Sequence, residues 1–214
     1  MVGVTESFDV YSVQDSAFSS SEGGVPDSAS IMERLYKMNA TVGMLDDRAD
    51  NLMGYRVIVP KGEPLTLPED YRQGTLEEHH VRRILNGVPE GIDDFIAETS
   101  LPLECNLDYM NGVDFRKGCY VGQELTIRTY HKGITRKRIM PVHEPESIQF
   151  SRDVVHVIPS QSELFPAKKE VATPTASSSS ARPVRASGKT GSNVGNIGLA
   201  LVKLDLVRKE ARSR

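Results

Sequence analysis

Apolar and polar positions along this chain follow two spacings, one typical of strands and one typical of helices. Alternation over residues 8–13 and over residues 54–59 predicts two strands, and Pro60 is expected to stop the second. Residues 134–142 alternate as well, and residues 197–206 form the last segment that we expect to be a strand.

The clearest predicted helix covers residues 76–86, and a shorter one is expected over residues 31–39. Thr75 can cap the longer helix and Glu78 stands three positions later, which together make a capping box. Gly87 is expected to end this helix. Four apolar side chains are expected to share its buried face: Leu76, Val81, Ile84 and Leu85.

A second convincing helix is predicted over residues 122–131. Glu124 lies in its first turn, where a carboxylate interacts favourably with the positive end of the helix dipole. Upstream of it, the pair Asn111-Gly112 predicts a tight turn between residues 107–110 and residues 113–115.

Composition changes this picture in the second half of the chain. Hydrophobic residues make up 38% of the sequence, below the usual share, so part of the length is not expected to pack. Residues 159–187 hold four prolines and a run of four serines, and such a segment buries too little apolar area to offset its ordering entropy. We therefore expect a disordered insertion there. No apolar run is long enough to predict a membrane span.

Charge is divided unevenly along the chain. Residues 1–108 carry 8 Lys and Arg against 20 Asp and Glu, whereas residues 109–214 carry 18 against 9. A basic half can indicate a polyanionic partner, but the basic residues do not follow the aromatic pattern of a nucleic-acid platform. We therefore expect no nucleic-acid partner, and the two charged surfaces can instead attract each other within one fold.

The densest group of chemically useful residues surrounds Cys119. Gly118 and Gly122 flank it and are expected to make a flexible, closely approached backbone around the thiol. The thiol lies just before the predicted helix 122–131, whose unpaired N–H groups, together with nearby cations, favour the thiolate. A thiolate here would be a nucleophile, a cluster ligand or a redox sensor, whereas the alternative is a small buried side chain beside a glycine turn.

The other cysteine, Cys105, is expected to be buried and unreactive. Two cysteines are too few for a secreted disulfide scaffold, which favours a reducing compartment. Since one cysteine cannot hold an iron–sulfur cluster, a cluster bound at Cys119 would need ligands from a second protein or a small thiol.

Residues 117–124, with the sequence KGCYVGQE, resemble the K-G-C-[FY]-x-G-Q-E signature of the YgfZ-type iron–sulfur cluster assembly factors. This family is built on the aminomethyltransferase (GcvT-like) fold. The similarity extends over about residues 45–145 and 186–207, and it is most evident with the mitochondrial branch.

The resemblance implies an α+β fold in two parts. An incomplete aminomethyltransferase-like domain of the folate-binding type is expected over residues 1–133. A small antiparallel C-terminal β-barrel is expected over residues 134–214, with the disordered insertion at 159–187. Family members begin with a substantial N-terminal portion, preceded in mitochondria by a transit peptide. Neither is visible here, so we expect the chain to be truncated at its N-terminus.

The resemblance also implies a function. Mitochondrial members help to mature 4Fe–4S proteins in the matrix together with A-type iron–sulfur carrier proteins, and bacterial relatives bind tetrahydrofolate-type ligands. We therefore expect a mitochondrial matrix assembly factor in which Cys119 is the catalytic residue and a cluster ligand shared with such a carrier. Residues expected to contact a bound cofactor are Lys117, Gly118, Cys119, Gly122, Gln123, Glu124 and Arg128.

Two other functions stay open. A folate-dependent aminomethyl transferase would need a base near the substrate amine, which Glu104 or Asp108 can supply. Catalytic transferases of this fold often carry an acid at the position of Cys119, so we favour the assembly factor over an enzyme. A non-functional fragment is the third interpretation, supported by the low apolar content and the missing N-terminal portion.

Overall fold

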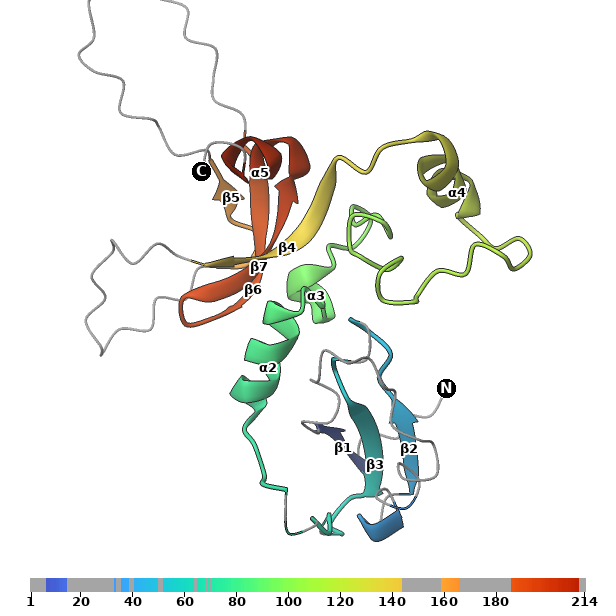
Figure 1. Cartoon of the computed structure of the whole chain (residues 1–214), viewed down its shortest axis with the longest axis vertical. Coiled ribbons are helices and arrows are strands. Elements are labelled where there is room, and N and C mark those ends of the chain that lie inside the picture. The colour runs from blue at the N-terminus through green and yellow to red at the C-terminus, as the bar shows by residue number, and fades with distance from the viewer. Residues whose placement is uncertain are drawn as a thin grey trace, which may run out of the picture. The chain divides into compact units, whose positions relative to one another are not determined.

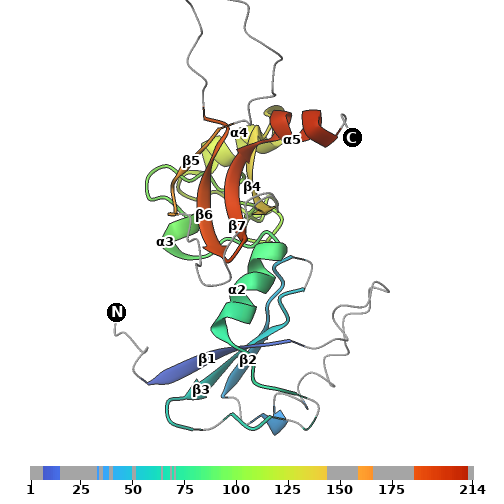
Figure 2. The same cartoon turned by 90° about the vertical axis from the view of Figure 1, so that its left-hand side faces the viewer.

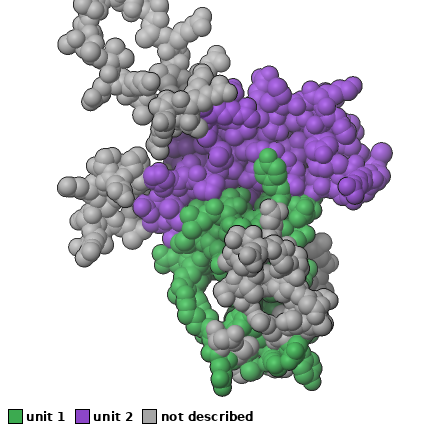
Figure 3. Space-filling model, in the orientation of Figure 1, with its two compact units in different colours: residues 1–88, 109–112 green, residues 89–108, 113–214 purple. Residues whose placement is uncertain are grey.

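The structure is a computed structural model in which the chain divides into two compact units (Figure 3). Unit 1 comprises residues 1–88 and 109–112, and unit 2 comprises residues 89–108 and 113–214. The residues that the structure describes are 7–14, 33, 36–38, 41–49, 52–63, 65–67, 69, 71–143, 159–165 and 186–211. The predicted boundary between residues 133 and 134 lies inside unit 2, and that division into domains stays a prediction.

Unit 1 contains a three-stranded antiparallel sheet in the order β1-β3-β2 (Figure 1). Every second side chain of β3 is buried, and Tyr55 and Val57 pack in a core with Val13 and Met38. The strands predicted over residues 8–13 and 54–59 are confirmed as β1 and β3, except that Pro60 is the last residue of β3 rather than the residue after it. The strands are β1 (Phe8–Val13), β2 (Val42–Leu45) and β3 (Tyr55–Pro60). Most of the helix predicted at 31–39 lies outside the described residues.

Helix α2 (Leu76–Leu85) starts with the predicted capping box. The Glu78 N–H donates to Thr75 Oγ1 at 3.1 Å, and the Thr75 N–H donates to Glu78 Oε2 at 2.8 Å. Arg72 adds an exposed ion pair to the Glu78 carboxylate at 2.7 Å. The turn after the helix contains Gly87 at φ 66°, a left-handed conformation that glycine adopts without strain.

The predicted apolar face of α2 is wrong at its two ends. Ile84 is fully buried, but Leu76 is 72% exposed and Leu85 is 60% exposed. These two positions are nine residues apart, which places them on opposite sides of a helix with 3.6 residues per turn. They therefore cannot both face the interior that Ile84 faces.

Asp46 is a buried carboxylate in unit 1, and its charge is balanced by two arginines. Arg48 donates from Nε and from Nη2 at 2.7 Å each, and Arg56 donates from Nε at 3.0 Å. Burial raises the pKa of Asp46, but the hydrogen bonds and charges of Arg48 and Arg56 outweigh burial and hold that pKa below its ordinary value. Two segments within the region of family resemblance, around Arg48 and Arg56, thus meet at one ion cluster.

Unit 2 contains a four-stranded antiparallel sheet in the order β4-β7-β6-β5, and Figure 2 shows β4, β7 and β6 side by side. Strands β6 and β7 form a hairpin whose turn contains Gly195 at φ 58°. Leu199 and Ala200 of β7 are buried with Ile139 of β4. The elements are α3 (Gly91–Asp94), α4 (Gln123–Lys132), β4 (Lys137–His143), β5 (Glu163–Leu164), β6 (Gly188–Val194), β7 (Ile197–Lys203) and α5 (Leu204–Ala211).

Asp94 fixes α3 on strand β6. Its carboxylate accepts the Ser192 N–H at 2.7 Å, the Ser192 hydroxyl at 2.9 Å and the Glu90 N–H at 2.8 Å. A Cβ on Gly191 would lie 2.4 Å from Asp94 Oδ1, so the approach requires glycine at that position. The buried carboxylate is therefore hydrogen-bonded both to strand β6 and to Glu90, the residue before α3.

A turn is present at Asn111, as predicted, within a run of turn residues at 102–111. Two predicted elements of unit 2 have other ends than expected. The strand predicted over residues 197–206 is shorter than expected, because β7 ends at Lys203 and α5 follows. Helix α4 confirms the prediction at 122–131 with both ends shifted by one residue.

The predicted disordered insertion at 159–187 is wrong at its margins. Residues 159–165 are described, and within them β5 pairs with β6 through Glu163 and Leu164. Residues 186–187 are described as well, whereas residues 166–185 lie outside the described part. None of the helices formed by described residues is long and apolar enough to span a membrane.

Candidate functional site

Cys119 lies on an exposed loop that leads into helix α4. No hydrogen bond or ion pair joins its thiol to another described residue. The helix begins at Gln123, after Gly122 as N-cap in the left-handed conformation at φ 83°. The loop thus presents the thiol to solvent a few residues before the first turn of α4, as the sequence predicts.

Gln123 holds the turn that follows the thiol. Its backbone N–H donates to the Tyr120 carbonyl at 3.2 Å, and its side-chain Oε1 accepts the Tyr120 N–H at 3.1 Å. Gly122 supplies the positive φ at the third residue of this turn, a position that favours glycine. Two hydrogen bonds between the same pair of residues therefore fix the backbone directly after Cys119.

Aromatic rings and cations surround this loop. Lys117 Nζ lies 5.2 Å from the centroid of the Tyr120 ring, a cation–π distance. Phe115 stacks on Tyr130 of α4 with ring centroids 3.7 Å apart and an interplanar angle of 13°. The stack ties the start of the loop to the second half of the helix, so the loop is anchored at both ends.

Most cations of this region face solvent. Residues 116–138 contain seven Lys and Arg and one acid, Glu124. Five of these cations are exposed, and none of the five pairs with an acid among the described residues: Arg116, Lys117, Arg128, Lys132 and Arg136. The surface around Cys119 and α4 is consequently positive, which favours negatively charged partners.

Cys105 lies in very different surroundings. It is 3% exposed, in a turn-rich segment that strand β4 holds in place. Burial raises the pKa of the Cys105 thiol, the charges of Glu104 and Asp94 raise it further, and a hydrogen bond with Ser100 lowers it. Both cysteines are free, and the prediction that Cys105 is buried is confirmed.

Arg138 of β4 is the group that holds this segment. Its two Nη atoms donate to the Asp108 carboxylate at 2.8 and 2.7 Å, and Nη1 also donates to the Leu103 carbonyl at 2.9 Å. The side chains of Asp108 and Arg138 are each 13% exposed. Because both carboxylate oxygens are engaged, Asp108 is a poor candidate for the base of a transferase.

The predicted site residues are distributed along the loop and one side of α4. Lys117, Gly118 and Cys119 are exposed on the loop, Gly122 and Gln123 form the turn, and Glu124 and Arg128 are exposed on the helix. Glu124 and Arg128 are four positions apart and so share a helix face.

One expectation about the glycines is wrong. A Cβ added at Gly118 or at Gly122 would meet nothing within 4 Å, so the backbone is not closely approached at either position. Gly122 is needed for its φ, and nothing in the described part of the chain explains Gly118. The two hydrogen bonds between Gln123 and Tyr120 are not predicted by the sequence, in which the only signal is a Gly-Gln pair at a helix start.

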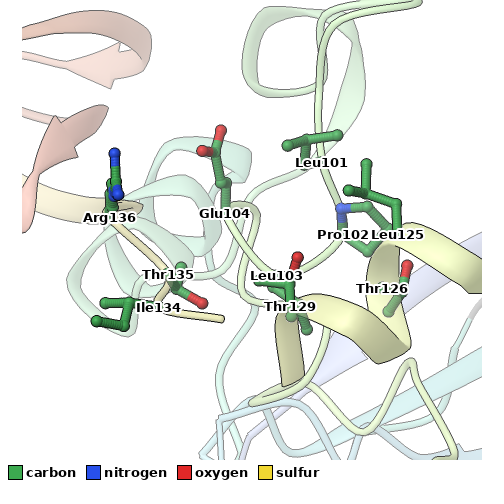
Figure 4. Close-up of a pocket in the computed structure, with 10 residues that line it drawn as sticks. All are labelled: Leu101, Pro102, Leu103, Glu104, Leu125, Thr126, Thr129, Ile134, Thr135 and Arg136. Atoms are coloured by element: carbon green, nitrogen blue, oxygen red, sulfur yellow. The ribbon is translucent and has the colours of Figure 1, made fainter. Parts of the chain in front are cut away.

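A pocket of about 200 Å³ opens between α4 and two neighbouring segments of unit 2 (Figure 4). In this view Leu101, Pro102 and Leu125 gather on one side, Ile134 and Arg136 lie opposite, and Glu104 lies between the two groups. The lining residues are Leu101, Pro102, Leu103, Glu104, Leu125, Thr126, Thr129, Ile134, Thr135 and Arg136. None of the predicted cofactor-contacting residues is among them.

This pocket does not fit a tetrahydrofolate-type ligand. Pockets for ligands of that size usually measure about 300–1,000 Å³. The volume of this pocket is smaller, and the residues that the resemblance assigned to a cofactor do not line it. Nor do any three His, Cys, Asp or Glu side chains of the described residues form a group that can hold a metal ion. Cys119 would therefore have to share a cluster with other molecules.

Comparison with known proteins matches the C-terminal part of the chain to a domain model and most of the chain to curated relatives. Residues 136–213 match the model of the CAF17 C-terminal beta-barrel domain. Mitochondrial iron–sulfur cluster assembly factor IBA57 homologues are similar over most of the chain. The homologue from Aspergillus oryzae is 40% identical over 79% of this chain, and that from Aspergillus fumigatus is 44% identical over 79%. The homologue from Cryptococcus neoformans is 40% identical over 88% of this chain.

The match covers only part of each relative. It spans 39% of the Aspergillus oryzae protein, 38% of the Aspergillus fumigatus protein and 50% of the Cryptococcus neoformans protein. The chain thus spans half the length of these relatives or less. The β-barrel expected at the C-terminus is confirmed by the family match, together with the mixed α and β content and antiparallel sheets of the structure.

Proposed function

We propose that this chain, which belongs to the family of the mitochondrial IBA57 iron–sulfur cluster assembly factors, supports the maturation of mitochondrial 4Fe–4S proteins in the matrix. The observation that carries the proposal is the exposed, unpaired thiol of Cys119 on a loop that Gln123 fixes at the start of α4. A thiol with no partner among the described residues can bind an iron atom without breaking an existing contact.

The cluster is the cargo of this function rather than a resident cofactor. Cys119 supplies one thiolate ligand, and the remaining ligands come from a carrier protein of the A type. Exposed cations around the loop favour encounter with an acidic face of that carrier. Lys117 lies within cation–π distance of Tyr120 on the same loop, so its positive charge stays close to the thiol.

The aminomethyltransferase-like nature of the N-terminal part belongs to the same proposal and rests on the family relationship. A tetrahydrofolate-type ligand remains a prediction of that relationship, and no step is assigned to it because the pocket does not fit it. No second function is favoured by a specific contact. Glu104 lines the pocket, and Asp108 is occupied by Arg138.

The test is rescue of 4Fe–4S enzyme activities in mitochondria of a strain that lacks its own family member. A targeting sequence and the N-terminal half of a relative are fused to the chain, so that import and length are the same for every variant. We expect the Cys119→Ser variant to give no more activity than the empty vector, and the matched Cys105→Ser variant to rescue. Full rescue by Cys119→Ser would show that the thiol has no role.

Folding and folate binding are checked separately. Near-UV circular dichroism of the purified chain distinguishes a folded protein from a non-functional fragment, which would lack a fixed tertiary signal. Calorimetry with tetrahydrofolate tests the cofactor prediction, and absence of heat would remove it while leaving the role of Cys119 intact.

A further inference from the structure

The pocket beside α4 is lined by apolar side chains that remain exposed to solvent. Leu101 is 38% exposed, Leu125 is 50% exposed and Ile134 is 78% exposed, although all three line the same hollow. They come from three segments, which Figure 4 shows converging on the pocket. Apolar surface gathered at a concave site, rather than scattered singly, is typical of a binding surface.

The size of the pocket limits what it can hold. A volume of about 200 Å³ is too small for a cofactor of ordinary size but large enough for an aliphatic side chain. Thr126 and Thr129 close the side formed by α4, and they add hydroxyl groups without a charge. The pocket therefore suits one apolar side chain that a partner inserts, as interface anchors commonly do.

The charges around the pocket define the rest of the partner. Leu125, Arg128 and Lys132 lie three to four positions apart, so they follow one side of α4. Arg136 lines the pocket itself, and none of these three cations pairs with an acid among the described residues. Glu104 is the one carboxylate among the lining residues and Arg136 is the one cation, so the excess of positive charge comes from Arg128 and Lys132 on α4.

We propose that this pocket is an anchor site for a partner protein segment that carries one aliphatic side chain flanked by carboxylates. The aliphatic side chain enters between Leu101, Leu125 and Ile134, and the carboxylates lie against Arg128, Lys132 and Arg136. The inference rests on the proposed function in one respect: such a segment would belong to the protein that shares the cargo at Cys119. The binding chemistry itself depends only on the pocket.

The experiment measures binding of fluorescein-labelled peptides to the whole chain by fluorescence anisotropy. The first probe alternates Glu and Asp around a single central Leu, the second has Ala in place of Leu, and the third has Gln and Asn in place of the acids. Since burial of the larger side chain favours the first probe, we expect it to bind at least roughly tenfold more tightly than the Ala probe. Raising the salt from about 0.05 M to about 0.3 M should weaken both acidic probes.

Two variants test whether the Leu side chain of the first probe binds in the pocket. Thr129→Trp fills the hollow and should abolish the preference for Leu over Ala, and Ile134→Asp, at an exposed position, should do the same if the first variant misfolds. Val121→Ala is the matched control, because Val121 is fully exposed and does not line the pocket. Arg128→Gln should weaken the Leu and Ala probes by the same few-fold factor.

Equal affinity for the Leu and Ala probes would overturn the proposal, and so would equal affinity for the acidic and neutral Leu probes. Self-association of the chain that Ile134→Asp abolishes would assign the pocket to a second copy instead, and would also overturn it. Each measurement is repeated with Cys119→Ser. If that variant fails in the rescue assay but keeps the preference for Leu over Ala, the role of Cys119 and the anchor site are independent of each other. If rescue depends on Cys119 but no probe binds selectively, the anchor site is overturned and the proposed function stands.

Discussion

The two cysteines of this chain lie fourteen residues apart in regions of opposite character. The segment around Cys105 has no strand or long helix of its own, yet it is buried and tied to β4 by Arg138 and by the hydrogen bond of the Ile139 N–H to the Glu104 carbonyl at 2.9 Å. The loop around Cys119 is exposed and is fixed mainly by its own neighbours, through Gln123 and the ring stack of Phe115 on Tyr130.

The difference shows that long-range and local contacts produce different kinds of thiol. Long-range contacts surround Cys105 and leave it no access to a partner, so its role is to pack. Local hydrogen bonds fix the backbone beside Cys119 without covering its side chain. A cargo-binding thiol needs this second arrangement, because it has to be held in place and still be reachable.

The largest effect on stability is expected from a substitution that removes the contacts holding the region around Cys105. Arg138→Met removes the partner of Asp108 and of two further acceptors, and it should lower the free energy of unfolding by about 3 kcal/mol. Urea unfolding followed by far-UV circular dichroism measures this, since the chain has no tryptophan. The matched control is Arg136→Met, which removes an exposed arginine and should change stability by less than about 0.5 kcal/mol. Equal losses from both variants would contradict the assignment.

Alkylation compares the two thiols directly. Iodoacetamide should label Cys119 roughly 100-fold faster than Cys105 in the native protein, because Cys105 reacts only after a local opening that costs about 3 kcal/mol. Mass spectrometry of the digested protein gives both rates in one experiment. In concentrated guanidinium chloride the two rates should converge. Similar rates under native conditions would mean that the burial of Cys105 has been misassigned.

The loop beside Cys119 can be broken at one of its two glycines. Gly122→Ala places a Cβ on a residue at φ 83° and should cost about 1 kcal/mol of stability, as well as loosening the turn closed by Gln123. Gly118→Ala is the control, since Gly118 has no such φ and an added Cβ meets nothing within 4 Å. Urea unfolding and the Cys119 labelling rate should both change for Gly122→Ala and stay unchanged for Gly118→Ala.

The smallest effect is a dependence on pH. Burial, helped by the charges of Glu104 and Asp94, raises the pKa of Cys105 in the folded protein, so the folded state keeps its proton more tightly than the unfolded state does. Its contribution to stability is full below the ordinary thiol pKa of about 8.5 and is lost as the pH rises through the higher pKa of the folded protein.

Replacing Cys105 by Ala should flatten the fall in stability above that pH relative to the parent protein. Unfolding midpoints measured over a series of alkaline buffers test this difference. A slope that does not change in Cys105→Ala would mean that other groups account for the alkaline loss.

Much of the local structure could be predicted because its causes lie close together in the sequence. Thr75 and Glu78 complete a capping box within one turn, and α4 begins after a glycine that its turn requires. The eight-residue signature around Cys119 identified the family, and the comparisons confirm that identification. The roles of the individual signature residues toward a cofactor stay predictions.

The predictions that failed concern residues whose contacts are with segments distant in the sequence. The strand expected over residues 197–206 ends at Lys203, and the N–H of the next residue, Leu204, donates to the Arg136 carbonyl at 2.9 Å. Glu163 and Leu164 lie in a segment that is low in complexity, yet pairing with β6 orders them as β5. No local sequence pattern predicts either of these two outcomes.

The sequence by itself determined the family, the helix that starts near Cys119, the glycine turn before it and the excess of cations around it. Tertiary structure alone decided that Asp108 is occupied by Arg138 and that three separate segments enclose an apolar pocket. The physical reason is the separation along the sequence between the residues that interact. Caps, turns and charge runs follow from neighbouring residues, whereas burial and ion pairing depend on which distant segment the folded chain brings alongside.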